Sequence, residues 1–409
     1  MLQELQLLTK IQRRTFVAAF LGWALDAFDF FLVTFVVARI AKEFHKGIAE
    51  IALGITVTLM LRPIGALIFG RLADRYGRRI PLMVNILLYS VVELLTAFAP
   101  NYEIFIGLRA VFGVAMGGEW GVGAALALES LPTKSRGLFS GILQQGYACG
   151  YLLAATAYAA VFPHFGWRGM FIVGAVPAFL VVYIRSSVPE SPIWLEHKAK
   201  PVAQTVGLWK SFLLQPMSYI GAILMMAAFN FMSHGSQDLY PTFLEQQHKF
   251  GIDTVAAIAI IVNIGAILGG MTFGALSQNF GRRRTIVAAS LTGILIIPLW
   301  AFSSNAPMLA LGGFLIQVFV QGAWGVVPVH LNELSPADVR GTFPGFTYQF
   351  GNLIAAGAAQ MEALFAQRFT LPGGGANYGE ALAIIMLIAF VAVAFFTTIG
   401  REQHAIDLS

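Results

Sequence analysis

A histidine and an aspartate stand one helical turn apart inside an otherwise apolar segment, in the stretch NFMSHGSQDLYPT at residues 230–242. Asn230, His234 and Asp238 follow one another at intervals of four residues, which places all three on one face of a helix with Gln237 at its border. A histidine and a carboxyl group at this spacing can share a proton, and each changes the pKa of the other. The stretch therefore predicts a site that binds a polar cargo and handles a proton.

Asp26 and Asp29 form a second unusual pair, in the apolar stretch GWALDAFDFF, on neighbouring positions of one helix surface. Two close carboxyl groups raise each other's affinity for protons, as burial does, which suits a group that must take up and release a proton. Arg62, in LMLRPIGAL, stays charged and offers a planar fork of donors that matches a carboxylate. Its partner is one of the two aspartates, an anionic substrate, or each in turn.

Further polar residues interrupt apolar segments elsewhere. Arg109 fits a structural role and a functional role equally well, because a long arginine side chain near a helix end can reach the membrane surface. Glu119, in GGEWG, has small neighbours that permit close helix packing, so we expect it to face protein, either as a proton site or as a hydrogen-bonding partner. Other residues that could line a cavity or join two helices are Gln144, Gln145, Tyr147, Asn263, Gln317 and Gln321.

The elements that hold these residues are membrane helices. The chain of 409 residues is 57% hydrophobic and only 11% charged, whereas a soluble domain is ~45–50% apolar and ~25% charged. The net charge of +5 is explained by basic loops beside a membrane rather than by nucleic acid. The single cysteine, Cys149, can form neither a disulfide framework nor a metal set. We therefore expect an integral membrane protein with no cofactor, no metal and no nucleic-acid partner.

The sequence predicts twelve spans, because about 20 apolar residues cross a bilayer core. They divide into a six-helix bundle at 1–188, a polar linker with three prolines at 189–215 and a second six-helix bundle at 216–409. Lysine and arginine are roughly three times as frequent in the loops on the side of the termini, so we expect the termini in the cytoplasm. The expected spans are 15–40, 50–72, 80–99, 103–127, 138–162, 168–187, 216–244, 254–277, 284–302, 307–330, 342–367 and 379–400.

The two halves of the chain repeat each other at an offset of 204 residues. GRLADRYGRR at 70–79 is echoed by GALSQNFGRR at 274–283, and Trp120-Gly121 by Trp324-Gly325. At the same offset Glu129 falls on Glu333, and Arg136-Gly137 falls on Arg340-Gly341. Two parallel repeats of six helices are typical of a transporter whose halves rock about a site at the membrane midplane.

The motif GRLADRYGRR resembles the loop between helices 2 and 3 of the major facilitator superfamily, and ESLPTKSRG (129–137) resembles its companion motif. The resemblance covers the whole chain. It implies charge contacts that hold a cytoplasmic gate closed, and the alternative is that these charges only set topology. Gln278 replaces the aspartate in the second copy, which weakens that copy. The implied gate residues are Asp74, Arg75, Arg78, Arg79, Glu129, Arg136, Glu333 and Arg340.

The stretch at 230–242 also resembles the helix 7 motif N-x-x-[ST]-H-x-[ST]-Q-D-x-x-x-T of the Jen-type monocarboxylate–proton symporters, in the sialate–proton symporter group of that superfamily. Every fixed position of the motif is met. The resemblance implies that His234 and Asp238 take part in proton coupling and substrate binding. It matches Gln349 and Asn352 in YQFGNL to a Q-x-x-N pair of the pore, and Arg62 by context to an arginine of the pore. The chain lacks the long hydrophilic N-terminal extension of the fungal members and looks like a bacterial version.

The sequence thus predicts a transporter that imports a small monocarboxylate such as lactate or pyruvate together with a proton. We expect a monomer in the bacterial inner membrane, with the lipid bilayer as its surroundings. A larger organic anion, such as sialic acid, a sugar acid or an aromatic acid, is the alternative substrate. A membrane enzyme or a channel is less consistent with the sequence, because the GxxxxGK[ST], HExxH and GxSxG motifs are absent and a channel needs no gate in each repeat. The predicted substrate contacts are Arg62, Asn230, His234, Gln237, Gln349, Asn352 and Gln145, and the predicted proton sites are Asp26, Asp29, His234, Asp238 and Glu119.

Overall fold

Helices make up almost all of the described protein. The computed structural model describes residues 8–129, 139, 142–191, 195, 212–334, 343–372 and 374–400. Within these ranges the only extended pairing is an isolated bridge between Thr370 and Ala376. The first half contains α2 (Lys10–Glu43), α3 (Ile48–Tyr76), α4 (Arg79–Ala97), α5 (Tyr102–Glu129), α7 (Gly146–Ala160), α8 (Phe162–Val173) and α9 (Ala178–Ser187). The second contains α12 (Pro216–Gln237), α13 (Tyr240–Gln246), α14 (Ile252–Phe280), α15 (Arg282–Phe302), α16 (Ala306–Leu334), α17 (Phe343–Ala355), α18 (Ala358–Arg368) and α19 (Tyr378–Ile399).

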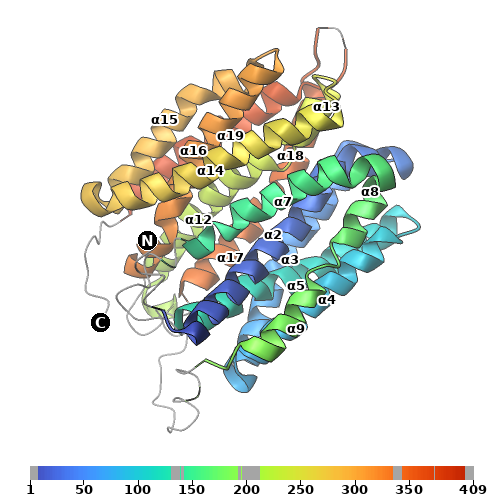
Figure 1. Ribbon diagram of the computed structural model, residues 1–409. Coiled ribbons are helices and arrows are strands. Elements are labelled where there is room, and N and C mark those ends of the chain that lie inside the picture. The colour runs from blue at the N-terminus through green and yellow to red at the C-terminus, as the bar shows by residue number, and fades with distance from the viewer. Residues whose placement is uncertain are drawn as a thin grey trace.

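The helices form two bundles that lie side by side, with α2–α9 in blue to green and α12–α19 in yellow to red (Figure 1). We call them the N-terminal half and the C-terminal half. The halves meet along two seams, where α7 packs against α14 and where α3 packs against α17 and α18. The expected linker at 189–215 lies mostly outside the described residues. The division of the chain at that linker therefore stays a prediction.

The expected all-helical membrane fold is confirmed. Nine helical segments of the described residues are long and apolar enough to cross a membrane. The three other expected spans, at 103–127, 138–162 and 342–367, coincide with α5, with α7 and with α17 and α18. The helices follow the predicted boundaries closely; α14, expected at 254–277, covers Ile252–Phe280.

Three spans that we expected to be continuous are broken, two of them near the middle and the span at 216–244 near its end. The span at 216–244 changes direction between α12 and α13, just before Pro241, because proline lacks the N–H of a helical hydrogen bond and restricts the residue before it. The span at 342–367 breaks between α17 and α18 at Ala356 and Gly357. The span at 168–187 breaks between α8 and α9, just before and at Pro177. Broken helices are a common way for transporters to place polar groups inside a membrane.

Glycine residues set the closest helix contacts in both halves. A Cβ atom added at Gly117 of α5 would lie 1.9 Å from the carbonyl oxygen of Arg62 in α3. In the C-terminal half, a Cβ atom at Gly269 of α14 would lie 2.1 Å from the carbonyl oxygen of Val318 in α16. Only glycine allows backbones to approach this closely, which is a frequent device between membrane helices.

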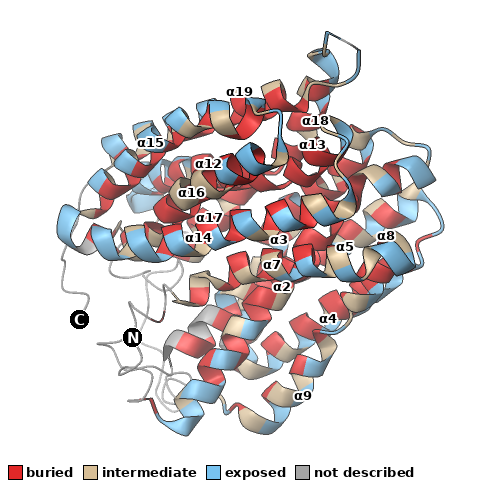
Figure 2. Ribbon diagram, turned by 45° about the horizontal axis from the view of Figure 1, so that its top comes forward, coloured by how far each residue is buried: buried red, intermediate tan, exposed pale blue. Residues whose placement is uncertain are grey.

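Burial follows the architecture. Buried residues gather on the sides of the helices that face the centre of the molecule, and exposed residues lie on the outer sides of α15, α19 and α4 (Figure 2). Large apolar side chains such as Leu295, Phe395 and Phe179 are among the exposed ones. An outer surface of this kind suits contact with lipid tails. The polar residues singled out in the sequence lie in the interior instead.

Candidate functional site

The stripe at Asn230, His234 and Asp238 lies in the interior, on α12, where the helix ends at its break. All three side chains are at most 3% exposed. The Nδ1 atom of His234 lies 3.1 Å and 3.3 Å from the two carboxylate oxygens of Asp238. The ring of His234 meets the edge of Phe30 of α2 at a centroid distance of 5.7 Å, so the pair sits against the other half of the molecule. The predicted histidine–aspartate contact is therefore formed.

A small cavity lies between the two halves, beside this stripe. Its volume is about 10 Å³, which is space for roughly one water molecule. Asn230 and His234 face it from α12, and residues of the α7 side, α16 and α17 complete its wall. The other lining residues are Gln144, Tyr147, Ser233, Gln321, Trp324 and Tyr348. The molecule is thus closed around its centre, and an organic acid could enter only after the halves move apart.

The expected amide residues divide between this cavity and contacts among helices. Gln237 donates a hydrogen bond from Nε2 to Oε1 of Gln317, at 3.0 Å, and faces α16 rather than the cavity. Asn352 donates from Nδ2 to Oε1 of Gln349, at 3.3 Å, so this pair of α17 is formed as expected. Gln145 lies against α14, where its Nε2 atom would be 2.6 Å from a Cβ atom at Gly270. It is Gln144 that lines the cavity.

Arg62 is fully buried in α3, behind one wall of the cavity. Its guanidinium lies 5.5 Å from the ring centre of Tyr348, which is itself a lining residue. Among the described residues, its Nε and Nη2 atoms have no hydrogen-bond partner. Arg62 can therefore offer donors to an anion that displaces the ring of Tyr348, which fits the expected role better than a permanent pairing with an aspartate.

Asp26 and Glu119 flank Arg62 from α2 and α5. Both carboxyl groups are fully buried, and within the described protein none of their oxygens accepts a hydrogen bond. Arg62 is the cation that interacts electrostatically with both. A Cβ atom at Gly22 would lie 2.5 Å from Oε1 of Glu119, so this carboxyl group reaches α2 one turn before Asp26. Asp26 and Glu119 thus both interact with Arg62; an aspartate partner for Arg62 was among the expectations, whereas Glu119 as a partner was not.

Asp29 lies toward Glu93 and Arg109 rather than toward Arg62, although it also interacts electrostatically with Asp26. Its Oδ1 atom would lie 3.2 Å from a Cβ atom at Gly174, and the groups that interact with it are Glu93, Asp26 and Arg109. Arg109 donates from Nη2 to Glu93 at 2.9 Å and to Thr96 at 3.0 Å. Both members of this ion pair are at most 1% exposed. The structural role that we had weighed for Arg109 is the one that these contacts describe.

Two acids that are 0% exposed were not among the predicted site residues, Glu93 of α4 and Glu362 of α18. Each stands inside a span that was expected from the sequence, at 80–99 and at 342–367. The rule that an ionisable group inside a membrane span marks a functional or paired site applies to both. The sequence therefore marked both acids as unusual, but it did not show which residues lie beside them.

Comparison with known proteins agrees with this arrangement. The family model described as Major Facilitator Superfamily matches residues 19–359. The chain belongs to the major facilitator superfamily. It is 32% identical over 99% of its length, and 71% of the other protein, to a carboxylic acid transporter protein homolog of Saccharomyces cerevisiae. It is 30% identical to the sialic acid transporter NanX of Escherichia coli, over 83% of this chain and 84% of that protein.

Another relative is a probable 4-methylmuconolactone transporter of Cupriavidus pinatubonensis, 30% identical over 97% of this chain and 92% of that protein. Among solved structures, the chain is similar to the xylose transporter XylE of Escherichia coli in a partially occluded inward-open conformation. That likeness has a TM-score of 0.78 and 16% identity, over 98% of this chain and all of the other. It shows the shared fold. The chain is thus a multi-pass membrane transporter of this superfamily.

The two copies of the superfamily's loop motif have matching backbones. Gly77 and Gly281 end α3 and α14 with φ of 95° and 88°, values that glycine adopts without strain. In the first copy, the backbone N–H groups of Arg78 and Arg79 donate to the carboxylate of Glu190, at 2.7 Å and 3.2 Å. This contact, which was not expected, joins the loop to the segment after α9.

The second copy of the motif forms a buried ion pair of its own. Arg282, the counterpart of Arg78, lies 3.3 Å from Glu333 in an ion pair whose side chains are 5% exposed. Arg75 of the first copy is exposed and lies over the ring of Tyr76. Of the other expected gate residues, the side chains of Asp74 and Glu129 and the whole of Arg136 and Arg340 lie outside the described residues. The expected gate therefore stays a prediction.

At the opposite end of the bundle, away from residue 10, the two halves are joined by polar contacts. The hydroxyl of Tyr158 in α7 donates a hydrogen bond to Glu245 in α13. The Nε atom of Arg39 in α2 lies 3.9 Å from the same carboxylate. The halves are thus held together at this end by residues from three helices.

Proposed function

We propose that this protein imports a small monocarboxylate, such as lactate or pyruvate, together with a proton, by exposing one central site to each side of the membrane in turn. The observation that carries the proposal is the buried contact between His234 and Asp238 beside a cavity that Asn230 also lines. A buried histidine–carboxylate pair can exist with or without an added proton at physiological pH. We infer that proton binding to this pair is linked to cargo binding in the adjoining cavity.

Arg62 supplies the complementary charge from the other half. Its unpartnered donors lie behind Tyr348, so a carboxylate in an enlarged cavity could receive a charge-assisted hydrogen bond from α3. Asn230 and Ser233 would meet the hydroxyl or keto oxygen of the cargo from α12. The monocarboxylate and its proton together carry no net charge, which removes most of the electrostatic cost of crossing a membrane.

Alternating access requires that the cavity open toward one side at a time. The contacts of Tyr158 and Glu245 close one end of the molecule. We propose that the charged loops at 70–79 and 274–283 close the other end when the halves rock. Relatives from bacteria include an inner membrane metabolite transport protein of Escherichia coli. This supports the bacterial inner membrane as the location, and the site needs only one copy of the chain.

Relatives also support a competing substrate class. Their names include transporters of sialic acid, cis,cis-muconate and niacin, which are larger or aromatic acids. The aromatic residues Tyr147, Trp324 and Tyr348 around the cavity could stack on such a cargo. We favour the small monocarboxylate because the helix 7 motif is complete.

Uptake of labelled lactate into proteoliposomes with an inward proton gradient tests the proposal. We expect accumulation that an uncoupler abolishes. Unlabelled pyruvate should compete strongly, and sialic or aromatic acids weakly. Lactate uptake that is absent, or that persists unchanged with the uncoupler, would contradict the proposal. Strong competition by sialic acid alone would favour the larger anion instead.

His234→Ala and Asp238→Asn test the proton site directly. We expect each to lower gradient-driven accumulation by about tenfold or more, which lies in the usual range of coupling between two binding sites. Exchange of labelled for unlabelled lactate at equal pH should suffer less, because it needs no net proton movement. Ser218→Ala, an exposed position on the same helix, is the control. Full accumulation by both variants would remove this pair from the mechanism.

A further inference from the structure

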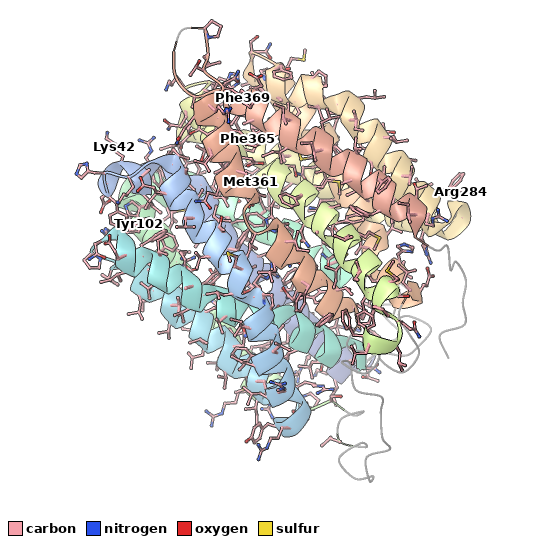
Figure 3. The ribbon with its side chains drawn as sticks, turned by 180° about the vertical axis from the view of Figure 1, so that it is seen from behind. Lys42, Tyr102, Arg284, Met361, Phe365 and Phe369 are labelled. Atoms are coloured by element: carbon pink, nitrogen blue, oxygen red, sulfur yellow. The ribbon has the colours of Figure 1, made fainter. Side chains whose placement is uncertain are left out.

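Glu362 is a carboxyl group that the proposed transport cycle has not used. It lies in α18, is fully buried, and neither of its oxygens accepts a hydrogen bond from a described residue. An ionised carboxylate without a donor is strongly destabilised in an apolar interior, so this position favours the neutral acid. Met361, Phe365 and Phe369 succeed one another along α18 (Figure 3). Met361 is 40% exposed on the outer side, while its neighbour Glu362 points inward.

The inward direction leads to the backbone of α12. A Cβ atom at Gly235 would lie 3.1 Å from Cγ2 of Ile385 and 3.2 Å from Oε1 of Glu362, so the carboxyl group approaches the backbone of α12 at this glycine. Gly235 directly follows His234, and Asp238 stands three residues further on, on the neighbouring turn. The absence of a side chain at position 235 thus brings a second carboxyl group close to the histidine–aspartate pair.

The surroundings isolate this group of three residues from other charges. Asp238 is the ionisable residue that interacts electrostatically with Glu362. The helices packed against α18 are α3, α19 and α12. α3 has no ionisable residue between Glu50 and Arg62, and α19 has none from Ala381 to its end. On α12 the ionisable residues are Tyr219 and His234, with Asp238 at its C-terminal cap, and the adjoining α17 carries only Tyr348. Asp238 is therefore the neighbouring charge on which the ionisation of Glu362 depends, in addition to its burial.

Both carboxyl groups also lie next to helix breaks. Asp238 caps the end of α12. Glu362 stands in the second turn of α18, just after the break at Ala356 and Gly357. Broken helices next to each other can shift separately when a transporter changes state. The distance between the two carboxyl groups can therefore change during the cycle, and with it the cost of ionising both.

We propose that Glu362 is a third proton-binding group of the His234–Asp238 site, and that Glu362 and Asp238 carry one negative charge between them. This inference rests on the proposed function and deepens it. A proton that enters from solvent raises the charge of the three residues by one. A transfer from the carboxyl group of Glu362 to the carboxylate of Asp238 leaves that charge unchanged and moves the proton from α18 to α12. Two carboxyl groups that interact in this way titrate as a pair.

Infrared spectroscopy of the purified transporter in lipid tests the inference without any substrate. The carbonyl band of protonated carboxyl groups is followed against pH in the wild type, in Glu362→Gln and in Asp238→Asn. We expect Glu362→Gln to remove one component of this band. In Asp238→Asn that component should be lost at a lower pH than in the wild type, because the competing negative charge is gone. Absence of the component, or an unchanged pH dependence in Asp238→Asn, would overturn the proposal.

Transport provides the second arm. In Glu362→Gln we expect gradient-driven lactate accumulation to fall by about tenfold, with exchange at equal pH retained and with partial recovery in Glu362→Asp. Gln367→Ala, at an exposed position of the same helix, is the control. Wild-type accumulation by Glu362→Gln would overturn the proposal. If the wild type itself failed to move lactate, the proposed function would fail, and the infrared titration would still decide whether Glu362 and Asp238 share a charge. If Glu362→Gln fails to fold, the infrared titration of Asp238→Asn still tests whether the two carboxyl groups share a charge.

Discussion

The two halves of the molecule share a backbone plan but differ in how they carry charge. Each end of α14 lies 204 residues after the corresponding end of α3, so the halves can be compared position by position. The positions of Asp26 and Asp29 in α2 are occupied in α12 by Asn230 and Ser233. The positions of other buried charges in the N-terminal half hold uncharged residues as well. Arg62, Glu93, Arg109 and Glu119 correspond to Ala266, Ile297, Gly313 and Ala323.

Around the proposed proton site, the C-terminal half carries the histidine and the acids, and the corresponding positions of the N-terminal half do not. His234 and Asp238 correspond to Phe30 and Thr34, and Glu362 corresponds to Tyr158. Away from the loop motifs, where Arg282 pairs with Glu333, the N-terminal half thus buries arginines with acids, while the C-terminal half buries amides and a histidine with acids. A fixed cation on one side of a cavity and neutral or titratable groups on the other suit a cargo that is an anion at one end and polar at the other. The two halves therefore share an architecture but not the chemistry of their buried residues.

Glu93→Gln should have the largest effect, because it breaks the charge pairing on which the N-terminal half depends. Arg109 would remain buried without its partner, and loss of one member of a buried ion pair costs ~3–5 kcal/mol. We expect a clear drop in the thermal unfolding temperature in detergent. The double variant Glu93→Leu with Arg109→Met should recover much of the loss, since it removes both charges, as the C-terminal half does at Ile297 and Gly313. A single variant as stable as the wild type would show that the pair contributes little.

Arg62→Gln should have the next largest effect, on transport rather than on stability. It removes the fixed cation that the C-terminal half lacks at Ala266. Loss of a buried charge contact with a ligand costs ~2–5 kcal/mol, so we expect kcat/KM for lactate to fall by about a hundredfold. Arg62→Lys, which keeps the charge but not the planar fork, should retain part of the activity. Uptake near the wild-type level in Arg62→Gln would place the carboxylate elsewhere.

Gly117→Ala should have a smaller effect. It tests the position of the α3 backbone while the charge of Arg62 stays the same. The new Cβ atom would press on the carbonyl oxygen of Arg62, and overpacking of this kind costs ~1–3 kcal/mol. We expect a severalfold higher KM for lactate and a modest loss of thermal stability, because α3 must shift while Arg62 keeps its charge. Gly121→Ala, one turn along α5 with open space around it, is the matched control. Equal behaviour of the two alanine variants would contradict the role of this close contact.

Much of the fold was predictable because its signals are local. Apolar length predicts each span, and the 204-residue repeat aligns the two bundles. The histidine–aspartate contact follows from a spacing of four residues within one helix, as does the contact of Gln349 with Asn352. The breaks were missed although Pro241 and Gly357 mark two of them. The length of each apolar segment predicted one continuous span, and this prediction took precedence over the break that these two residues indicate.

The partners of the buried charges were not predictable in the same way. Asp26 and Asp29 lie on neighbouring positions of α2, yet one lies near Arg62 and the other near Glu93 and Arg109. Which helix each position faces depends on how α2 packs among α3, α4 and α5, and no spacing within α2 contains that information. Gln237 turned toward Gln317 instead of the cavity for the same reason. Glu190 became a partner of the loop at 70–79 across more than one hundred residues.

The aromatic residues at the centre form a natural optical reporter. The ring of Tyr348 lies 5.2 Å from Trp120 of the N-terminal half and 5.9 Å from Trp324 of its own half. A rigid rotation of one half against the other must change the first contact and can leave the second unchanged. The fluorescence of Trp120 should therefore follow the relative motion of the halves, with Trp324 as an internal reference and without any attached dye.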